Sequence, residues 1–177
     1  MTLGLQGARL DLEPIKAKHA SEAWPYLDDV RMWMYFPNLR PKSLEDLRAT
    51  YARWENPYHA EGELRENWAC RDRSTGQLVG TMQATTFPAR AVSYIAYGVF
   101  VAYQRQGYAR EACGAVLQHL VQELHIRQVF AEMAVANEAS FRLVESLGFK
   151  RLEKRRAPSQ LGVDGDEYTY ELDISNT

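Results

Sequence analysis

The sequence predicts an α/β (α+β) fold in which a mixed sheet of about seven strands carries helices on its faces. Three observations predict this fold. Segments with the two-residue alternation of half-buried strands are interspersed with segments that have apolar residues at helical spacing. Their order along the chain is β-α-α-β-β-β-α-β-α-β-β, which excludes an all-parallel, doubly wound sheet. No internal repeat and no linker rich in Pro, Gly or Ser divides the chain, so residues 1–177 are expected to form a single domain.

The N-terminal part is expected to contain one strand followed by two helices. Residues 8–15 alternate leucines with charged side chains, which is typical of a half-buried strand. Residues 18–30 and 43–54 carry apolar residues at helical spacing, and Ser43 is a suitable N-cap for the second helix. The segment between them, residues 32–37, is too apolar for an ordinary solvated loop.

The remainder of the chain is expected to contain six strands and two helices. A long helix begins at Gly107, and Asn137 caps a shorter helix that stops at Gly148. The strands are recognised by their apolar, β-branched and aromatic content and by the turns between them, and they are expected at residues 67–73, 77–85, 92–101, 129–135, 149–156 and 167–174.

Composition and charge limit the class of protein. Hydrophobic residues make up 46% of the chain and charged residues 25%, as in soluble globular proteins. The formal net charge of -2 lacks the basic excess that phosphate neutralisation requires, so no nucleic-acid partner is expected. The longest nearly apolar run is far shorter than the roughly 20 residues that span a bilayer, and no signal peptide is evident, so we expect a cytoplasmic protein without membrane contact. The histidines and cysteines show no metal-ligand spacing, so no metal is expected.

Residues 94–112 carry the most informative pattern, a strand that passes through a short loop into a helix at Gly107. The first N–H groups of a helix have no intrahelical partner and the helix dipole is positive there, so a phosphate group can bind to the backbone. Arg105 and Arg110 add positive charge, while Gly107 and Ala109 leave room for a close approach. A plain strand-to-helix crossover with an incidental glycine is the alternative interpretation.

Two blocks of sequence resemble a known family. Gln104-x-x-Gly107-x-Ala109 resembles the (Q/R)-x-x-G-x-(G/A) acetyl-CoA signature of the GNAT superfamily of N-acetyltransferases. Residues 95–112 resemble its RimJ/RimL-like branch, which includes ribosomal-protein N-terminal acetyltransferases, and residues 137–149 resemble the N-x-x-S and L-G-F element of that branch. The resemblance covers nearly the whole chain. It implies a mostly antiparallel sheet with helices on both faces, in which splayed central strands form the acetyl-CoA slot.

The resemblance also implies where the cosubstrate acetyl-CoA binds. Its pyrophosphate would lie on the N–H groups of residues 105–110, and its pantetheine arm would pair like an extra strand with residues 100–101. Asn137 resembles the family residue that hydrogen-bonds the pantetheine, and it is also a good helix cap. The expected cofactor-binding residues are Val99, Phe100, Val101, Gln104, Arg105, Gln106, Gly107, Tyr108, Ala109, Arg110, Asn137 and Ser140.

The implied reaction is a direct attack of a primary amine on the thioester, with transfer of the acetyl group. A backbone N–H near Phe100 or Val101 would polarise the carbonyl group. Ser140 resembles the hydroxyl placed near the sulfur, where it could protonate the departing thiolate. A serine is equally ordinary in the first turn of a helix, so that alternative stays open.

The general base is not identified by the resemblance. Many relatives carry a glutamate where this chain has Tyr94, and the attacking amine must still lose a proton. Glu132, Tyr97 and Asp166 are the candidates near the expected slot. The residues expected to be catalytic are Ser140, Tyr97 and Glu132.

The acceptor pocket is expected between the first strand and Trp68, because the early helices cover that side in GNAT proteins. This segment is rich in aromatic residues and carboxylates, which suit a cationic amine, and its polar residues 59–66 are expected to line or gate the pocket. The expected acceptor-binding residues are Trp33, Tyr35, Glu61 and Glu63.

Three alternatives for the function stay open at this point. The acceptor is either the N-terminal amine of a protein or a small amine such as an aminoglycoside or a polyamine. A non-catalytic, acetyl-CoA-binding regulatory domain is the third alternative, because the expected glutamate is absent. The protein is expected to be a monomer or a homodimer.

Overall fold

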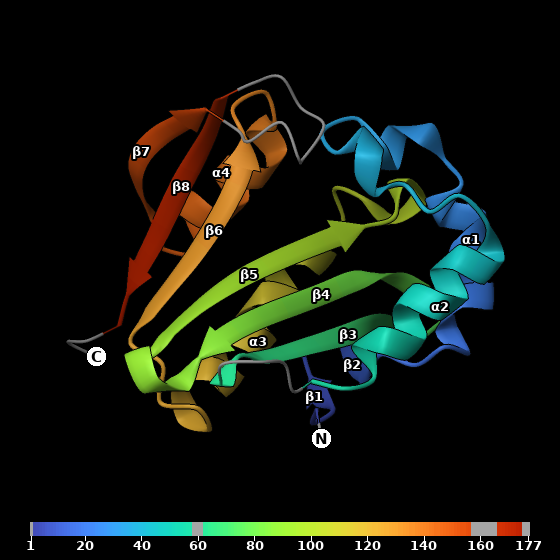
Figure 1. Cartoon of the computed structure of the whole chain (residues 1–177), viewed down its shortest axis with the longest axis horizontal. Helices are drawn as coiled ribbons and strands as arrows, with labels where there is room; N and C mark the ends of the chain where they lie inside the picture. Colours follow the sequence, from blue (N-terminus) through green and yellow to red (C-terminus); the bar gives the residue numbers. More distant parts are fainter. Residues whose placement is uncertain (1, 58–61, 157–165, 175–177) are drawn as a thin grey trace.

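The protein forms one eight-stranded sheet with helices on both faces (Figure 1). The computed structural model describes residues 2–57, 62–156 and 166–174. The strands follow the order β1-β2-β3-β4-β5-β6-β8-β7, in which only β5 and β6 are parallel and all other neighbours are antiparallel. Their bounds are β1 Leu5–Gln6, β2 Leu10–Pro14, β3 Leu64–Asp72, β4 Leu78–Phe87, β5 Val92–Val99, β6 Gln128–Ala134, β7 Lys150–Arg156 and β8 Asp166–Asp173.

In the described part of the chain, α-helices and short 3-10 helices connect these strands. The α-helices are α1 His19–Leu27, α2 Leu44–Trp54, α3 Tyr108–Gln122 and α4 Glu138–Ser146. The 3-10 helices are η1 Val30–Trp33, η2 Pro37–Leu39, η4 Pro88–Arg90 and η5 Val101–Tyr103. Within the described ranges, no helix is long and apolar enough to cross a membrane.

The sheet separates two apolar cores. Neighbouring residues of β3 point to opposite faces, so Trp68 and Cys70 join one core while Ala69 joins the other. The core with Trp68 packs against α3 and α4, and the core with Ala69 packs against α1 and α2. Figure 1 shows α2 in front of the sheet and α3 behind it. The expected mixed sheet with helices on both faces is therefore confirmed.

The two parallel strands pair over only part of their length. Val92–Tyr94 of β5 pairs with Gln128–Phe130 of β6, and the pairing ends there. On its other side, β6 pairs with β8 along its whole length. Figure 1 shows β5 and β6 diverging from their shared end. This is the splay that the resemblance implied.

The structure differs from the sequence prediction in one added strand and in the bounds of several elements. A two-residue strand, β1, is added at the sheet edge, where it was too short for its pattern to be recognised. The first expected helix ends at Leu27, and the apolar segment that follows forms η1 and η2. β3 begins at Leu64, so Glu66, which was expected in a polar loop, lies in a strand and is 4% exposed.

Candidate active site

The loop between η5 and α3 has a backbone shaped to bind an anion. Arg105 has a φ of 62° and Gly107 a φ of 84°, so two residues of the loop are left-handed. Alternating right- and left-handed residues direct successive N–H groups to one side, which forms a concave anion site. The first intrahelical bond of α3 runs from Glu111 N to Gly107 O, at 3.1 Å, so the preceding N–H groups are not used by the helix.

Arg9 holds this loop from the neighbouring strand segment. Its Nη2 donates to Gln106 O at 3.1 Å, and its Nε donates to Glu111 Oε2 at 2.9 Å. Leu10 N donates to the same carboxylate at 2.8 Å. Desolvation raises the pKa of Glu111, but the hydrogen bonds from Arg9 and Leu10 outweigh it, so this pKa lies below its ordinary value. The sequence analysis missed Arg9, because nothing in its local pattern indicates a contact about a hundred residues away.

The side chains of the expected cofactor-binding residues have different roles in the structure. Tyr108 is buried, and its hydroxyl donates to Asp72 Oδ2, so only its backbone faces the loop. Arg110 Nη1 donates to Ser146 Oγ at 2.9 Å. Gln104 Nε2 donates to Val99 O at 3.1 Å and thereby connects the loop to the end of β5.

The backbone N–H that polarises the carbonyl group was expected near Phe100 or Val101. The N–H of Phe100 itself donates to Val79 O at 2.9 Å, and its side chain is 1% exposed. Alternate residues of an antiparallel strand direct their N–H groups to the same neighbour. Because Phe100 N–H points to β4, the N–H groups of Val99 and Tyr97 point the other way, into the gap between β5 and β6. Among the backbone groups near Phe100, the N–H of Val99 is therefore the candidate donor.

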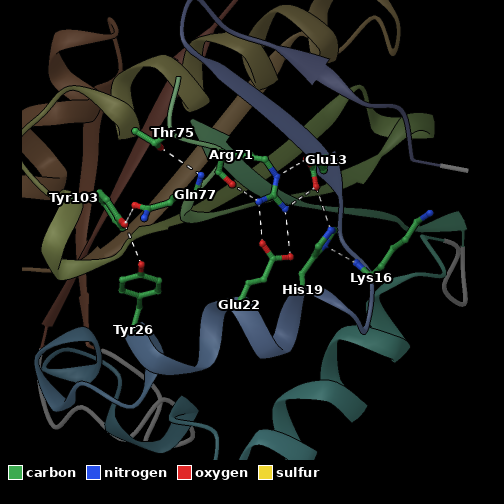
Figure 2. Close-up of polar contacts among 10 residues, drawn as sticks. Glu13, Lys16, His19, Glu22, Tyr26, Arg71, Thr75, Gln77 and Tyr103 are labelled. Atoms are coloured by element: carbon green, nitrogen blue, oxygen red, sulfur yellow. Dashed lines mark hydrogen bonds and ion pairs between the residues drawn. The ribbon is translucent and has the colours of Figure 1, made fainter. Parts of the chain in front are cut away.

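Helix α1 is attached to the same loop by aromatic residues (Figure 2). Tyr26 stacks on Phe100 with ring centroids 4.9 Å apart, and its hydroxyl lies 3.0 Å from that of Tyr103 in η5. Tyr103 in turn donates to Gln77 Oε1. This chain of contacts fixes the position of η5, and hence of the anion-binding loop, against both α1 and β4.

A second polar cluster fixes α1 to the sheet (Figure 2). Arg71 Nε donates to Glu13 Oε1 at 2.6 Å, and Arg71 Nη1 donates to Glu22 Oε2 at 2.9 Å. The hydrogen bond from Arg71 lowers the pKa of Glu13, against the effect of desolvation. His19 Nε2 lies 3.2 Å from Glu13 Oε2, and burial lowers the pKa of this imidazole. The cluster has a structural role, since its side chains lie outside the cavity lining.

A cavity of about 450 Å³ extends from the gap beside β5 across the face covered by α1 and α2. Its walls are aliphatic and aromatic, and they include Ile15, Leu27, Met32, Trp33, Phe36, Leu39 and Trp54. Its floor is the sheet, with the polar side chains of Asn67, Thr81, Gln83 and Thr85. At the end near β6 it is lined by Tyr94, Tyr97, Glu132, Asn137, Ser140 and Glu167.

Two of the expected catalytic residues form a hydrogen-bonded pair in this cavity. Tyr97 Oη lies 2.7 Å from Ser140 Oγ, which joins β5 to the first turn of α4. Burial raises the pKa of the Tyr97 phenol, so Tyr97 stays protonated at neutral pH. Asn137 caps α4, since its Oδ1 accepts from Ser140 N at 3.2 Å, and the capping bond fixes Ser140 beside Tyr97.

Two carboxylates stand at the same end of the cavity. Glu132 lies on β6, as the sequence analysis expected, and Glu167 lies on β8. Tyr94, which replaces the usual glutamate, stacks on Phe130 with centroids 5.2 Å apart. Asp166 begins β8, where only its backbone is described. The carboxylates of this site therefore come from the strands across the gap from β5.

The expected acceptor-binding residues are only partly brought together. Trp33 lines the cavity and donates from Nε1 to Leu27 O at 2.7 Å. Tyr35 Oη donates to Ala136 O at 3.3 Å and lies outside the cavity lining. Glu63 is paired with Arg65 at 2.6 Å, and Glu61 lies outside the described residues.

The expected position of Glu66 requires a correction. It was grouped with the loop carboxylates that attract the acceptor, but it points into the core behind the sheet. His119 Nε2 lies 2.9 Å from Glu66 Oε2, and both side chains are buried. The polar loop was expected to extend to Glu66 because charged residues precede it, whereas the strand starts two residues earlier.

Several residues of the cavity were missed by sequence reasoning, and three of them carry polar groups that the chemistry of the site could use. Asn67, Gln83 and Glu167 occupy strand positions, and in the sequence they resemble polar residues on a solvated face. The only signal was their strand alternation, which cannot distinguish solvent from a polar cavity. In the described part of the chain, no group of three His, Cys, Asp or Glu side chains could hold a metal ion.

The sequence was compared with known families and proteins. The sequence model of the acetyltransferase (GNAT) domain matches residues 9–150. No curated protein matches the chain significantly.

Solved structures share the whole fold at low sequence identity. An acetyltransferase of the GNAT family from Bacillus anthracis is 20% identical with a TM-score of 0.82, and the match covers 98% of this chain and 100% of that one. RimL, a ribosomal L7/L12 alpha-N-protein acetyltransferase in complex with coenzyme A, is 18% identical with a TM-score of 0.82 over 96% of this chain and 97% of its own. The microcin C7 self immunity acetyltransferase MccE, in complex with acetyl-CoA and AMP, is 17% identical with a TM-score of 0.79 over 94% and 93%.

Proposed function

The chain belongs to the GNAT acetyltransferase family, and from this premise we propose that it transfers the acetyl group of acetyl-CoA to a primary amine bound in the cavity beside β5. The observation that carries the proposal is the splay of β5 and β6, because it leaves the end of β5, between the cavity and the anion-binding loop, without a paired strand on that side. The transfer is direct, from the thioester to the amine, without an acetylated residue.

The residues of the loop fit the diphosphate part of acetyl-CoA. The left-handed Arg105 and Gly107 direct N–H groups outward, and a Cβ on Gly107 would lie 3.4 Å from Arg9 Nη2, so the Arg9 guanidinium borders the loop at this point. Backbone N–H groups of residues 105–110 hold the phosphates, with Arg105 adding charge. The N–H of Val99 lies at the edge where the pantetheine arm would pair. When bound there, acetyl-CoA supplies an activated acetyl group.

Val99, Tyr97 and Ser140 have distinct proposed roles. The N–H of Val99 polarises the carbonyl oxygen and holds the negative charge that develops on it. Tyr97 keeps its proton because burial raises the pKa of its phenol, so it acts as an acid and not as the base. Tyr97 protonates the departing thiolate, either directly or through the 2.7 Å bond to Ser140. The second proton, which the nitrogen loses as the amide forms, returns to Tyr97 and restores its phenol.

The proton of the ammonium group leaves toward the carboxylates across the gap. Glu132 and Glu167 line the cavity at the end where Tyr97 and Ser140 lie. Carboxylates bind the ammonium form and accept its proton directly or through water. The aromatic wall residue Trp33 packs against the rest of the acceptor.

Two acceptors are compatible with this site. The N-terminal amine of a protein is the first candidate, and RimL, which has the same fold, is described as an alpha-N-protein acetyltransferase. A small amine is the second candidate. A walled cavity of about 450 Å³ favours it, since this is a usual volume for a small-molecule site.

Release of free thiol from acetyl-CoA in the presence of a panel of amines tests the proposal. Turnover that depends on the amine and falls at least tenfold in Tyr97→Phe supports it. Binding of acetyl-CoA without amine-dependent thiol release for any peptide or small amine would instead identify a regulatory domain.

A further inference from the structure

Asn67 is a buried polar residue in the cavity. It lies on β3 in the floor of the cavity and is 2% exposed. Neither its Oδ1 nor its Nδ2 has a hydrogen-bond partner among the described residues. Its backbone is fixed, since Asn67 O accepts from Ile15 N at 2.9 Å. An unpaired buried amide lowers stability, so this residue is explained by a ligand that pairs with it.

The sheet register places Asn67 at a defined distance from the reacting end. Asn67 pairs with Gln83 of β4, and Gln83 pairs with Ala96 of β5, so the three residues form a row across the sheet. Two strand spacings separate Asn67 from β5, which is about 10 Å. Gln83 lies midway and carries a second amide into the cavity.

Charge is distributed unevenly along the cavity. Among the lining residues that the structure describes, the charged ones are Glu132 and Glu167, and both lie beyond β5. The other end, around Asn67, holds neutral amides and hydroxyls beneath the apolar wall that includes Trp54. An acceptor with one ammonium group fits this distribution, whereas a linear polyamine would place a second ammonium group beside Asn67 and far from both carboxylates.

We propose that Asn67 is the specificity-determining residue of the acceptor cavity and pairs with a neutral amide of the acceptor, two strand spacings or about 10 Å from β5, the strand beside which the amine is acetylated. The proposal rests on the amine acetylation proposed above. An asparagine side chain offers both a donor and an acceptor, which is the complement of another amide. An extended peptide advances roughly 3.3–3.6 Å per residue, so about three residues of it span the distance between β5 and Asn67. The acceptor class is thus a peptide-like monoamine.

Binding of three probes of matched length tests this without requiring turnover. Alanyl-alanyl-alanine amide, octylamine and spermidine each place a different group near Asn67: an amide, a methyl group and an ammonium group. In 15N-labelled protein, the side-chain NH2 signals of Asn67 are assigned by their loss in Asn67→Leu. We expect the tripeptide amide to shift these signals and the other two probes to leave them nearly unchanged.

Kinetics and stability give a second readout. Asn67→Leu is expected to raise KM for the tripeptide amide about tenfold, to lower KM for octylamine, and to leave acetyl-CoA affinity unchanged. Because the change removes an unpaired buried amide, we expect the melting temperature to stay equal or to rise by ~2–4 °C. Gln118→Leu, on an exposed position of α3, is the control for a surface amide and should change none of these values.

The outcomes separate the proposal from the proposed function. Thiol release with any of the three amines establishes amine acetylation, and the selectivity of Asn67→Leu then tests Asn67 alone. Three results would overturn the assignment of Asn67. The Asn67 signals could shift with spermidine and not with the tripeptide amide, or they could shift with none of the probes. Asn67→Leu could also leave the selectivity among the three amines unchanged. A ten-residue peptide that begins with three alanines distinguishes the two possible sources of the acceptor amine. A KM equal to that of the tripeptide amide indicates a protein N-terminus, and loss of turnover indicates a free peptide-like molecule.

Discussion

Replacing Gly107 with alanine measures how much acetyl-CoA binding depends on the left-handed backbone at the start of α3. Gly107 has a φ of 84°, where an alanine costs roughly 1–2 kcal/mol. Its Cβ would also lie 3.4 Å from Arg9 Nη2, the group that holds Gln106 O. Gly114, in the same helix, is a matched control because a Cβ there meets nothing within 4 Å.

The effect on binding follows from how the loop relieves this strain. If the loop keeps its shape, Gly107→Ala lowers the free energy of unfolding by about 1–2 kcal/mol. If it rotates to a negative φ, at least one N–H moves away from the phosphates, and a hydrogen bond to a charged group contributes about 1.5–3 kcal/mol. We therefore expect acetyl-CoA affinity to fall ~10–100-fold. Gly114→Ala should raise stability by about 0.8–1.0 kcal/mol and leave affinity unchanged.

Titration calorimetry with acetyl-CoA and urea unfolding provide the two measurements. Gly107→Glu adds a carboxylate at the proposed phosphate site and should weaken binding further than Gly107→Ala does. A folded Gly107→Glu protein that binds acetyl-CoA as tightly as the wild type would refute the assignment of this loop.

Three further changes test other parts of the site and the fold. Ser140→Ala should lower kcat about 10–100-fold with little change in KM for acetyl-CoA, and a loss of affinity alone would make Ser140 a binding residue. Burial lowers the pKa of His19, so the native state keeps this imidazole neutral. The contribution of His19 to the free energy of unfolding should therefore be constant above pH 6.5 and fall as the pH drops below it. His19→Gln should remove this pH dependence, which urea titrations at pH 5.5 and 7.5 measure. The double variant Glu61→Gln, Glu63→Gln should raise the acceptor's KM most at low salt, and wild-type kinetics there would show that this loop does not steer the acceptor.

The parts of the fold that the sequence predicted are those with local signals. Ser43 caps α2 with its hydroxyl 3.1 Å from Asp46 N, as its position before an apolar stripe indicated. Gly148 adopts a positive φ just after α4, where glycine is the usual residue, and Gly107 adopts one at the start of α3. These features depend on a few neighbouring residues, so they can be predicted from the sequence without knowledge of the packing.

The parts that were missed depend on contacts between distant segments. Glu66 and Asn67 are adjacent in β3, yet one pairs with His119 behind the sheet and the other faces the cavity in front. Alternation along the strand predicts that they point to opposite faces, but not which face is covered by a helix and which by a ligand cavity. Similarly, Phe100 N–H could be assigned to β4 only once the register with Val79 was known.

The replacement of the usual glutamate by Tyr94 has a consistent explanation in the splayed sheet. Tyr94 lies in the last residue pair before β5 and β6 separate, and its ring stacks on Phe130 of β6. A glutamate there would lose this aromatic contact, which closes the paired end of the gap. The carboxylates of the cavity instead lie on β6 and β8, at Glu132 and Glu167, so they face β5 from across the gap. The family pattern led us to expect the proton-accepting carboxylate on β5. The proposed carboxylates instead lie on the other side of the amine, across the gap from β5.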